Sequence, residues 1–234
     1  PLYSSAASDV YKRQLSFQRK APRSIGVLFM KRRILCFGDS NTWGYTPVTA
    51  VRYDEKTRWT GVLQEKLGPE YAIIEEGLSG RTTVFDVDFD DLQNGKKALG
   101  YILKSQQPLD AAIVFLGTND VVDHKMDRVE LGITEIIRQI KNANYIIRSN
   151  TSIFTHDARI LLIGPLAFGP GCALPKEIIE ESKLFSRTYK RVSERMGVEF
   201  LDLNGQVCPS SEDGIHLTQE AHGRVASLVF KKLK

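Results

Sequence analysis

The sequence predicts an α/β fold in which helices cover both faces of a parallel sheet. Two observations lead to this prediction. Short apolar runs alternate along the chain with longer segments of helical periodicity, and several of these runs are continuous, as is typical of strands buried on both faces. A length of 234 residues suits one such domain, and 42% hydrophobic with 26% charged residues is ordinary for a globular protein.

Five apolar runs bounded by turn residues predict a five-stranded sheet. In chain order they are Ile34–Gly38, Tyr71–Glu76, Ala111–Leu116, Arg159–Ile163 and Val198–Leu203. Helical periodicity predicts helices at Trp59–Leu67, Lys96–Lys104, Val129–Arg148, Lys176–Met196 and Thr218–Lys232. Ligands bind outside the carboxyl ends of the strands in such sheets, so we expect the connections 44–58, 81–95 and 164–175 to line a site.

The first residues differ from the rest of the chain in charge. Residues 1–33 hold eight basic residues and one acidic residue, so the remaining residues have a net charge of −3 within the total of +4. Residues 1–30 lack the pattern of a secretory signal, and Ser4–Gln14 resembles translated sequencing-adapter sequence. We expect residues 1–30 to be a non-native or disordered leader, with an organelle transit peptide as the other interpretation, and residues 31–234 to form one domain.

Charge, hydropathy and cysteine content bear on partners and cofactors. The mildly acidic domain argues against a nucleic-acid partner, and no apolar run approaches the roughly 20 residues that cross a membrane. The three cysteines, Cys36, Cys172 and Cys208, are too scattered for a disulfide framework and favour a reduced, cytoplasmic protein. Histidines and cysteines do not cluster with ligand spacing, so we expect neither a metal nor a cofactor.

The first segment that carries chemistry is Gly38-Asp39-Ser40-Asn41-Thr42, directly after the first predicted strand. Gly38 permits a tight turn, and Ser40 would lie near the N-terminus of the next segment, where backbone N–H groups stabilise a nucleophile's negative charge. The alternative is that Asp or Ser at this point only caps a helix.

Two further segments follow the second and third strands. In Gly77–Thr83, the N–H of Gly80 can point at a developing oxyanion, and in Leu116–Asp120 the Asn119 amide can donate to the same charge. Each segment is also compatible with an ordinary turn, and we expect Asp120 to be structural.

The last segment is Asp213-Gly214-Ile215-His216, before the final predicted helix. An Asp three residues before a His can accept the Nδ1–H of the imidazole, which leaves Nε2 free to take a proton from a serine. The other histidines, His124, His156 and His222, have no carboxylate at this spacing in a loop and are interpreted as surface or packing residues.

The order of these four segments resembles the four diagnostic blocks of the SGNH (GDSL-like) hydrolases, and most closely their arylesterase/acyltransferase branch. The resemblance runs from about residue 32 to the C-terminus; Asn41 departs from the Leu that often follows the serine in that branch. It implies a three-layer α/β/α sandwich of the flavodoxin-like SGNH type. It also implies a catalytic triad of Ser40, Asp213 and His216.

The resemblance further implies an oxyanion hole formed by the N–H groups of Ser40 and Gly80 and the Asn119 side chain. The expected function is that of a serine esterase that hydrolyses short-chain aryl, alkyl or acetylated carbohydrate esters through an acyl-serine, with acyl transfer to an alcohol or peroxide as a further activity. Members of the branch assemble through their site loops, so a homo-oligomer is expected. Asp39, Asn41, Trp43 and Ser79 are assigned to substrate contact. The aromatic residues Trp43, Tyr45, Phe85 and Phe168 lie on the expected site loops and either narrow the acyl pocket or take part in ordinary packing.

Two non-catalytic functions remain as alternatives. One is a flavodoxin-like binding module in which Gly38–Thr42 cradles a phosphate, and the other is a carbohydrate-binding protein on an inactive hydrolase fold. Neither gives the Asp213–His216 pair a role, and no Lys follows the glycine loop as a phosphate-binding loop requires.

Overall fold

The computed structural model describes residues 31–88, 92–149 and 151–234; the predicted leader at 1–30 lies outside this range. The sheet contains β1 (Arg32–Gly38), β2 (Tyr71–Gly77), β3 (Leu109–Phe115), β4 (Phe154–Gly164) and β5 (Glu199–Asp202). The helices are α2 (Ser40–Trp43), α3 (Trp59–Leu67), α4 (Gly95–Gln106), α5 (Asp120–Asp123), α6 (Met126–Lys141), α7 (Ala143–Ile146), α8 (Lys176–Ser182), α9 (Phe185–Met196) and α10 (Gln219–Leu233).

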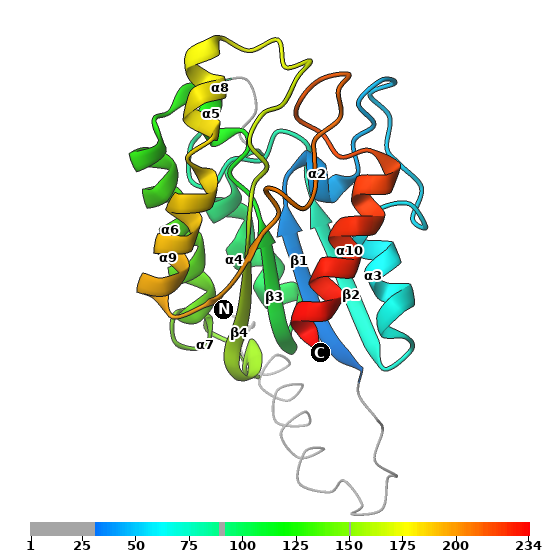
Figure 1. Ribbon diagram of the computed structural model, residues 1–234. Coiled ribbons are helices and arrows are strands. Elements are labelled where there is room, and N and C mark those ends of the chain that lie inside the picture. Colours follow the sequence, from blue (N-terminus) through cyan, green and yellow to red (C-terminus); the bar gives the residue numbers. More distant parts are fainter. Residues whose placement is uncertain (1–30, 89–91, 150) are drawn as a thin grey trace, which may run out of the picture. The chain divides into compact units, whose positions relative to one another are not determined.

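The five strands form one parallel sheet in the order β2-β1-β3-β4-β5, which is the flavodoxin-like order and confirms the predicted fold class (Figure 1). The strand order reverses between β1 and β3, because β2 lies on one side of β1 and β3 on the other. Gly38 at the end of β1 pairs with Gly77 of β2 and with Phe115 of β3. The loops that follow these three strands therefore start side by side, at the position where such sheets bind ligands.

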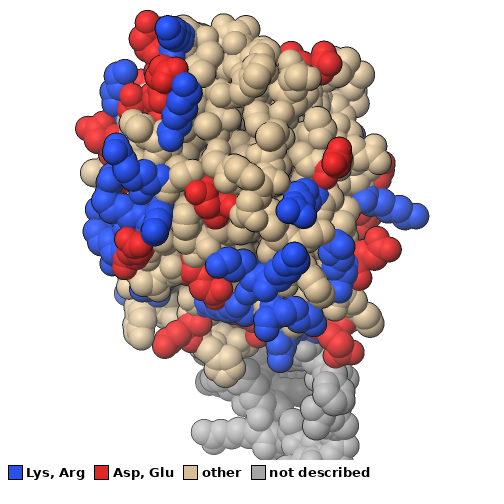
Figure 2. All heavy atoms as spheres, in the orientation of Figure 1, with Lys and Arg blue, Asp and Glu red and all other residues tan. Residues whose placement is uncertain are grey.

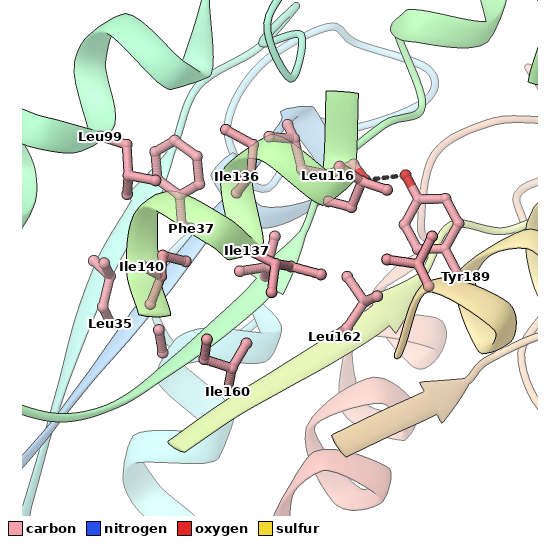
Figure 3. Close-up of a cluster of buried hydrophobic side chains, with 14 of the residues drawn as sticks. Leu35, Phe37, Leu99, Leu116, Ile136, Ile137, Ile140, Ile160, Leu162 and Tyr189 are labelled. Atoms are coloured by element: carbon pink, nitrogen blue, oxygen red, sulfur yellow. Dashed lines mark hydrogen bonds between the residues drawn. The ribbon is translucent and has the colours of Figure 1, made fainter. Parts of the chain in front are cut away.

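Side chains of β1 alternate between two buried clusters. Leu35 and Phe37 pack with residues of α4, α6 and α9, whereas Ile34 and Cys36 pack with residues of α3 and α10. Figure 3 shows the first cluster between the sheet and the helices that cover it. Burial of each large aliphatic side chain stabilises the fold by about 1.5–3 kcal/mol. The two clusters make the protein a three-layer α/β/α sandwich, as expected from the resemblance.

A tyrosine fixes the end of β3 from the α9 side. The hydroxyl of Tyr189, a fully buried side chain, donates to the carbonyl oxygen of Leu116 at 2.7 Å (Figure 3). The next residue, Gly117, has φ +124°, and a Cβ there would lie 1.9 Å from the Tyr189 hydroxyl. Only glycine fits this turn, which leads directly to Asn119.

Two predicted helices are each broken into two. The predicted helix 129–148 ends as α6 at Lys141, because the Asn142 side chain donates to the Arg138 carbonyl, and Asn144 exchanges two hydrogen bonds with the backbone of Phe154. The predicted helix 176–196 is divided after Ser182, whose Oγ accepts the N–H of Phe168. The bonds of Asn144 to Phe154 and of Ser182 to Phe168 join these helices to other segments, and helical periodicity does not predict such bonds.

His222 of α10 is buried against the N-terminus of α3. Its Nδ1 accepts the N–H of Trp59 at 3.2 Å, and the ring of Tyr53 meets it edge-on with centroids 5.3 Å apart. Burial, with smaller contributions from Arg58 and His216, lowers the pKa of His222 from 6.5 to about 4. The unfolded chain therefore binds more protons than the folded one between these two values, and stability falls as the pH falls through this window.

Replacement of His222 by glutamine is expected to reduce this acid sensitivity, because glutamine keeps an acceptor for Trp59 but does not ionise. Between about pH 7 and about pH 4.5, the variant should lose about 1–3 kcal/mol less free energy of unfolding than the wild type. Urea unfolding of both proteins at the two pH values measures the difference. An equal loss in both proteins would contradict the burial of a neutral His222.

Candidate active site

Ser40 is the first residue of α2 and lies directly beyond the end of β1. The Asp39 side chain caps this short helix, since its Oδ1 accepts the N–H of Asn41 at 3.0 Å. A Cβ on Gly38 would lie 2.1 Å from the Thr42 hydroxyl, so the turn between strand and helix has room only for glycine. The local sequence thus places the Ser40 hydroxyl at the carboxyl edge of the sheet.

The structure brings Ser40 together with His216 and Asp213. His216 Nε2 lies 2.9 Å from Ser40 Oγ, and His216 Nδ1 lies 2.6 Å from Asp213 Oδ2. The other carboxylate oxygen of Asp213 accepts the backbone N–H groups of Ile215 and His216 at 2.9 and 3.0 Å. Partial burial acts to raise the pKa of Asp213, but these N–H bonds and the imidazole outweigh it, so its pKa lies below the ordinary value. The carboxylate stays charged and orients the imidazole.

Asn41 joins the segment that carries Ser40 to the segment that carries His216. Its Oδ1 accepts the N–H of Leu217 at 3.0 Å, and the residue is only 3% exposed. The Asn side chain therefore holds the imidazole loop against α2. The substrate contact predicted for its neighbour Asp39 is corrected, because that side chain is completely buried and its pKa is raised by burial.

Three N–H donors lie on the loops that begin at the paired ends of β1, β2 and β3. Within the described part of the chain, the backbone N–H groups of Ser40 and Gly80 have no acceptor. Gly80 has φ +80°, a backbone conformation that favours glycine at this position. Asn119 Nδ2 donates one hydrogen to the Arg81 carbonyl at 2.9 Å, which leaves its second hydrogen for a ligand.

Arg81 contacts the loops of the candidate site, and no sequence pattern indicated these contacts. Its buried guanidinium donates to the carbonyl oxygens of Gly38, at 2.9 Å, and of Glu76, and lies 4.3 Å from the centre of the Phe37 ring. Burial lowers the pKa of Arg81 to about 10, so it remains charged near neutral pH. Arg81 thus fastens the ends of β1 and β2, while its own carbonyl anchors Asn119.

Asp120 fastens the loops after β2 and β3 to one another. The two carboxylate oxygens of Asp120 accept the backbone N–H of Thr83, at 3.0 and 3.1 Å. The Thr83 hydroxyl also donates to this carboxylate. Burial, opposed by these Thr83 bonds, raises the pKa of Asp120 to about 6. The structural role expected for Asp120 is what its contacts indicate.

Trp43 and Ser79 are the other predicted substrate contacts, and Tyr45 is one of the aromatic residues expected in the acyl pocket; each has its own surroundings. The half-buried ring of Trp43 is covered by the Arg52 guanidinium, whose Cζ lies 5.3 Å from the ring centre. The Ser79 hydroxyl is buried and has no partner among the residues that the structure describes. Tyr45 stacks on the imidazole of His216, with ring centroids 4.2 Å apart.

Two aromatic residues expected in the acyl pocket lie in other surroundings. Phe168 is 5% exposed and packs edge-on against Phe185 in the hydrophobic core. The ring centroids of Phe85 and His124 are 3.8 Å apart, and the Arg128 guanidinium also lies over the Phe85 ring. Phe168 is therefore a core residue and not part of an acyl pocket, which corrects the prediction. Phe85 faces α5 and α6.

In the described ranges, no group of three or more His, Cys, Asp or Glu side chains is arranged to hold a metal ion. No helix in these ranges combines the length and apolar character needed to cross a membrane. Charged side chains are also sparse over the middle of the upper half of the face shown in Figure 2, where the loops after the strands lie.

Comparisons with known proteins bear on this site. The sequence profile described as "GDSL-like Lipase/Acylhydrolase family" matches residues 36–224. Est24, a carbohydrate acetylesterase from Sinorhizobium meliloti, is 33% identical over 87% of this chain and 98% of its own, with a TM-score of 0.80. The native aryl esterase of M. smegmatis is 30% identical over 86% and 98% of the two chains, with a TM-score of 0.79. No curated protein matches this sequence.

Proposed function

The chain belongs to the GDSL-like lipase/acylhydrolase family, and from this membership we propose that it is a serine esterase acting on short-chain acyl esters through an acyl-serine intermediate. The observation that carries the proposal is the continuous hydrogen-bonded relay from Asp213 through His216 to Ser40. The two non-catalytic alternatives give this relay no role, and the similar solved structures named above are esterases.

In the proposed reaction, His216 Nε2 takes the proton of Ser40 as Oγ attacks the ester carbonyl carbon. The carbonyl oxygen becomes an oxyanion, which the N–H groups of Ser40 and Gly80 and the Asn119 amide stabilise. When the tetrahedral intermediate collapses, the imidazolium gives its proton to the leaving alcohol. Water, deprotonated by the same imidazole, then attacks the acyl-serine, and the acid leaves as Ser40 regains its proton.

The substrate is proposed to be an uncharged ester with a small acyl group. Ser40 is 4% exposed and the Tyr45 ring lies against the adjacent His216, so a small acyl group is proposed to fit at the hydroxyl. Charged side chains are sparse over the middle of the upper half of the face in Figure 2, which fits a neutral ligand. The relatives named as an aryl esterase and a carbohydrate acetylesterase make aryl acetates and acetylated sugars the first substrates to compare.

Acyl transfer is a second proposed activity. An alcohol that binds beside the acyl-serine can accept the acyl group in place of water, with the same imidazole as its base. Product analysis with an acyl donor and excess alcohol tests this activity. Free acid as the only product would remove transfer from the proposal without affecting hydrolysis.

The test of the esterase itself is turnover of p-nitrophenyl acetate by the purified protein. We expect many turnovers per protein molecule, with acetate and p-nitrophenol released in equal amounts. Release of a single equivalent of p-nitrophenol, or no release above the buffer rate, on this ester and on acetylated sugars would contradict the proposed function.

A further inference from the structure

Tyr45 contacts the imidazole that the proposed mechanism uses as its base. The centroids of the two rings are 4.2 Å apart and their planes are inclined by 30°, so the phenol lies over the face of His216. At the edge of the imidazole, Nδ1 is hydrogen-bonded to Asp213 and Nε2 to Ser40. The carboxylate, the serine and the tyrosine thus approach the ring from three directions.

The backbone holds Tyr45 in place at the end of α2. The N–H groups of Gly44 and Tyr45 donate to the Ser40 carbonyl at 2.9 and 3.0 Å, so the stacking residue is attached to the nucleophile's own helix. Tyr45 also forms an antiparallel bridge with Arg52, and the Tyr53 N–H donates to the Gly44 carbonyl at 2.7 Å. The connection that follows Tyr45 is therefore folded back on itself like a hairpin.

Ion pairs with Glu75 of β2 anchor this connection to the sheet. Arg52 and Arg58 both pair with the Glu75 carboxylate, Arg58 at 2.9 Å. The Arg52 Nε also donates to the Trp43 carbonyl at 2.8 Å, and Arg58 donates to the Tyr53 carbonyl at 2.7 Å. The side chains of Arg58 and Glu75 are 13% and 17% exposed, so water screens this pair less than it screens ordinary surface ion pairs, whereas Arg52 is 40% exposed. The position of the phenol is thereby tied to β2, the edge strand beside β1.

We infer that Tyr45 is a positioning residue for the proposed reaction: its ring fixes the plane of the His216 imidazole and stabilises the imidazolium that forms when Ser40 loses its proton. An aromatic face is negatively polarised and attracts a cation stacked on it. The neutral imidazole before the reaction gains less from this contact than the imidazolium in the transition state. The contact therefore lowers the barrier rather than merely tightening substrate binding. This inference rests on the proposed function.

The test compares Tyr45→Leu with Tyr45→Phe, and uses Tyr53→Leu as a matched control. Tyr53 lies in the same connection, and its ring contacts His222 instead of His216. We expect Tyr45→Leu to lower kcat for p-nitrophenyl acetate by about 3- to 30-fold with little change in KM, as the strength of cation–π contacts implies. Tyr45→Phe keeps the ring and should retain kcat within about two-fold, as should Tyr53→Leu.

Several results would overturn the inference. These are an unchanged kcat in Tyr45→Leu, a loss confined to KM, an equal loss in Tyr53→Leu, and a loss in Tyr45→Phe as large as that in Tyr45→Leu. A wild-type protein without esterase activity would remove the proposed function together with the inference. An active wild type with an unaffected Tyr45→Leu would remove the inference alone.

NMR of the wild type gives a second measurement that does not depend on how the leucine variant folds. The carbon-bound ring protons of His216 should be shifted upfield by the overlying phenol, relative to those of the exposed His156. Absence of this shift would mean that the two rings do not stack in solution and would also overturn the inference.

Discussion

Replacement of Ser40 by alanine is expected to lower kcat for p-nitrophenyl acetate by about four to six orders of magnitude, the range seen when a serine nucleophile is removed from a hydrolase. The reason is that the hydroxyl bonded to His216 Nε2 at 2.9 Å would no longer exist, and no acyl-serine could form. The change deletes one buried oxygen, so the fold should be retained. Spectrophotometric release of p-nitrophenol measures the loss.

A serine distant from the site provides the control for this variant. Ser227 lies within α10, where its hydroxyl donates to the Gly223 carbonyl at 2.9 Å. Ser227→Ala should keep the wild-type kcat, and the melting temperatures of both variants should lie close to that of the wild type. Retention of a tenth or more of the activity in a folded Ser40→Ala protein would show that another group is the nucleophile.

Replacement of Asn119 by alanine is expected to lower kcat by about 100- to 1000-fold, the usual effect of removing one oxyanion donor. Asn119 is held by its bond to the Arg81 carbonyl, so its second amide hydrogen is already oriented before substrate binds. KM should change little, because the full negative charge exists only in the transition state. Steady-state kinetics over a range of ester concentrations separates the two constants.

Asn142→Ala serves as the control for the asparagine variant. Asn142 also donates to a backbone carbonyl, that of Arg138, but it lies exposed at the end of α6. A large kcat loss in Asn142→Ala, or a loss in Asn119→Ala that appears only in KM, would argue against an oxyanion contact. An Asn119→Ala protein with a normal melting temperature and an unchanged kcat would exclude the contact directly.

The parts of the fold that depend on local sequence were predicted well. Each of the five strands overlaps the apolar run that predicted it, and the runs of β1 and β3 are continuous because these strands are buried on both faces. β4 begins at Phe154, five residues before the predicted Arg159. The helix predicted at Trp59–Leu67 has the same bounds in the structure. The two divided helices were missed because their breaks depend on bonds from Asn144 to Phe154 and from Phe168 to Ser182.

The candidate site likewise contains features that local sequence predicts and features that it does not. The spacing of Asp213 and His216 could be interpreted from sequence because both members of the pair lie in one short turn. The bond from Leu217 to Asn41 and the contacts of Arg81 join segments far apart in the chain, and no local pattern reports them. A buried arginine after a glycine turn looks in sequence like any surface arginine. The stack of Tyr45 on His216 likewise follows from how two loops meet, although the sequence had marked Tyr45 as a site aromatic.

The central claim is that Ser40 is a nucleophile activated by His216, and covalent labelling tests it most directly. The protein is treated with a fluorophosphonate, which reacts with activated serines, and the adduct is located by intact mass and peptide mapping. We predict one adduct, on Ser40, absent from Ser40→Ala and formed far more slowly in His216→Ala. A label on another residue, or equal labelling of Ser40 with and without His216, would contradict the account.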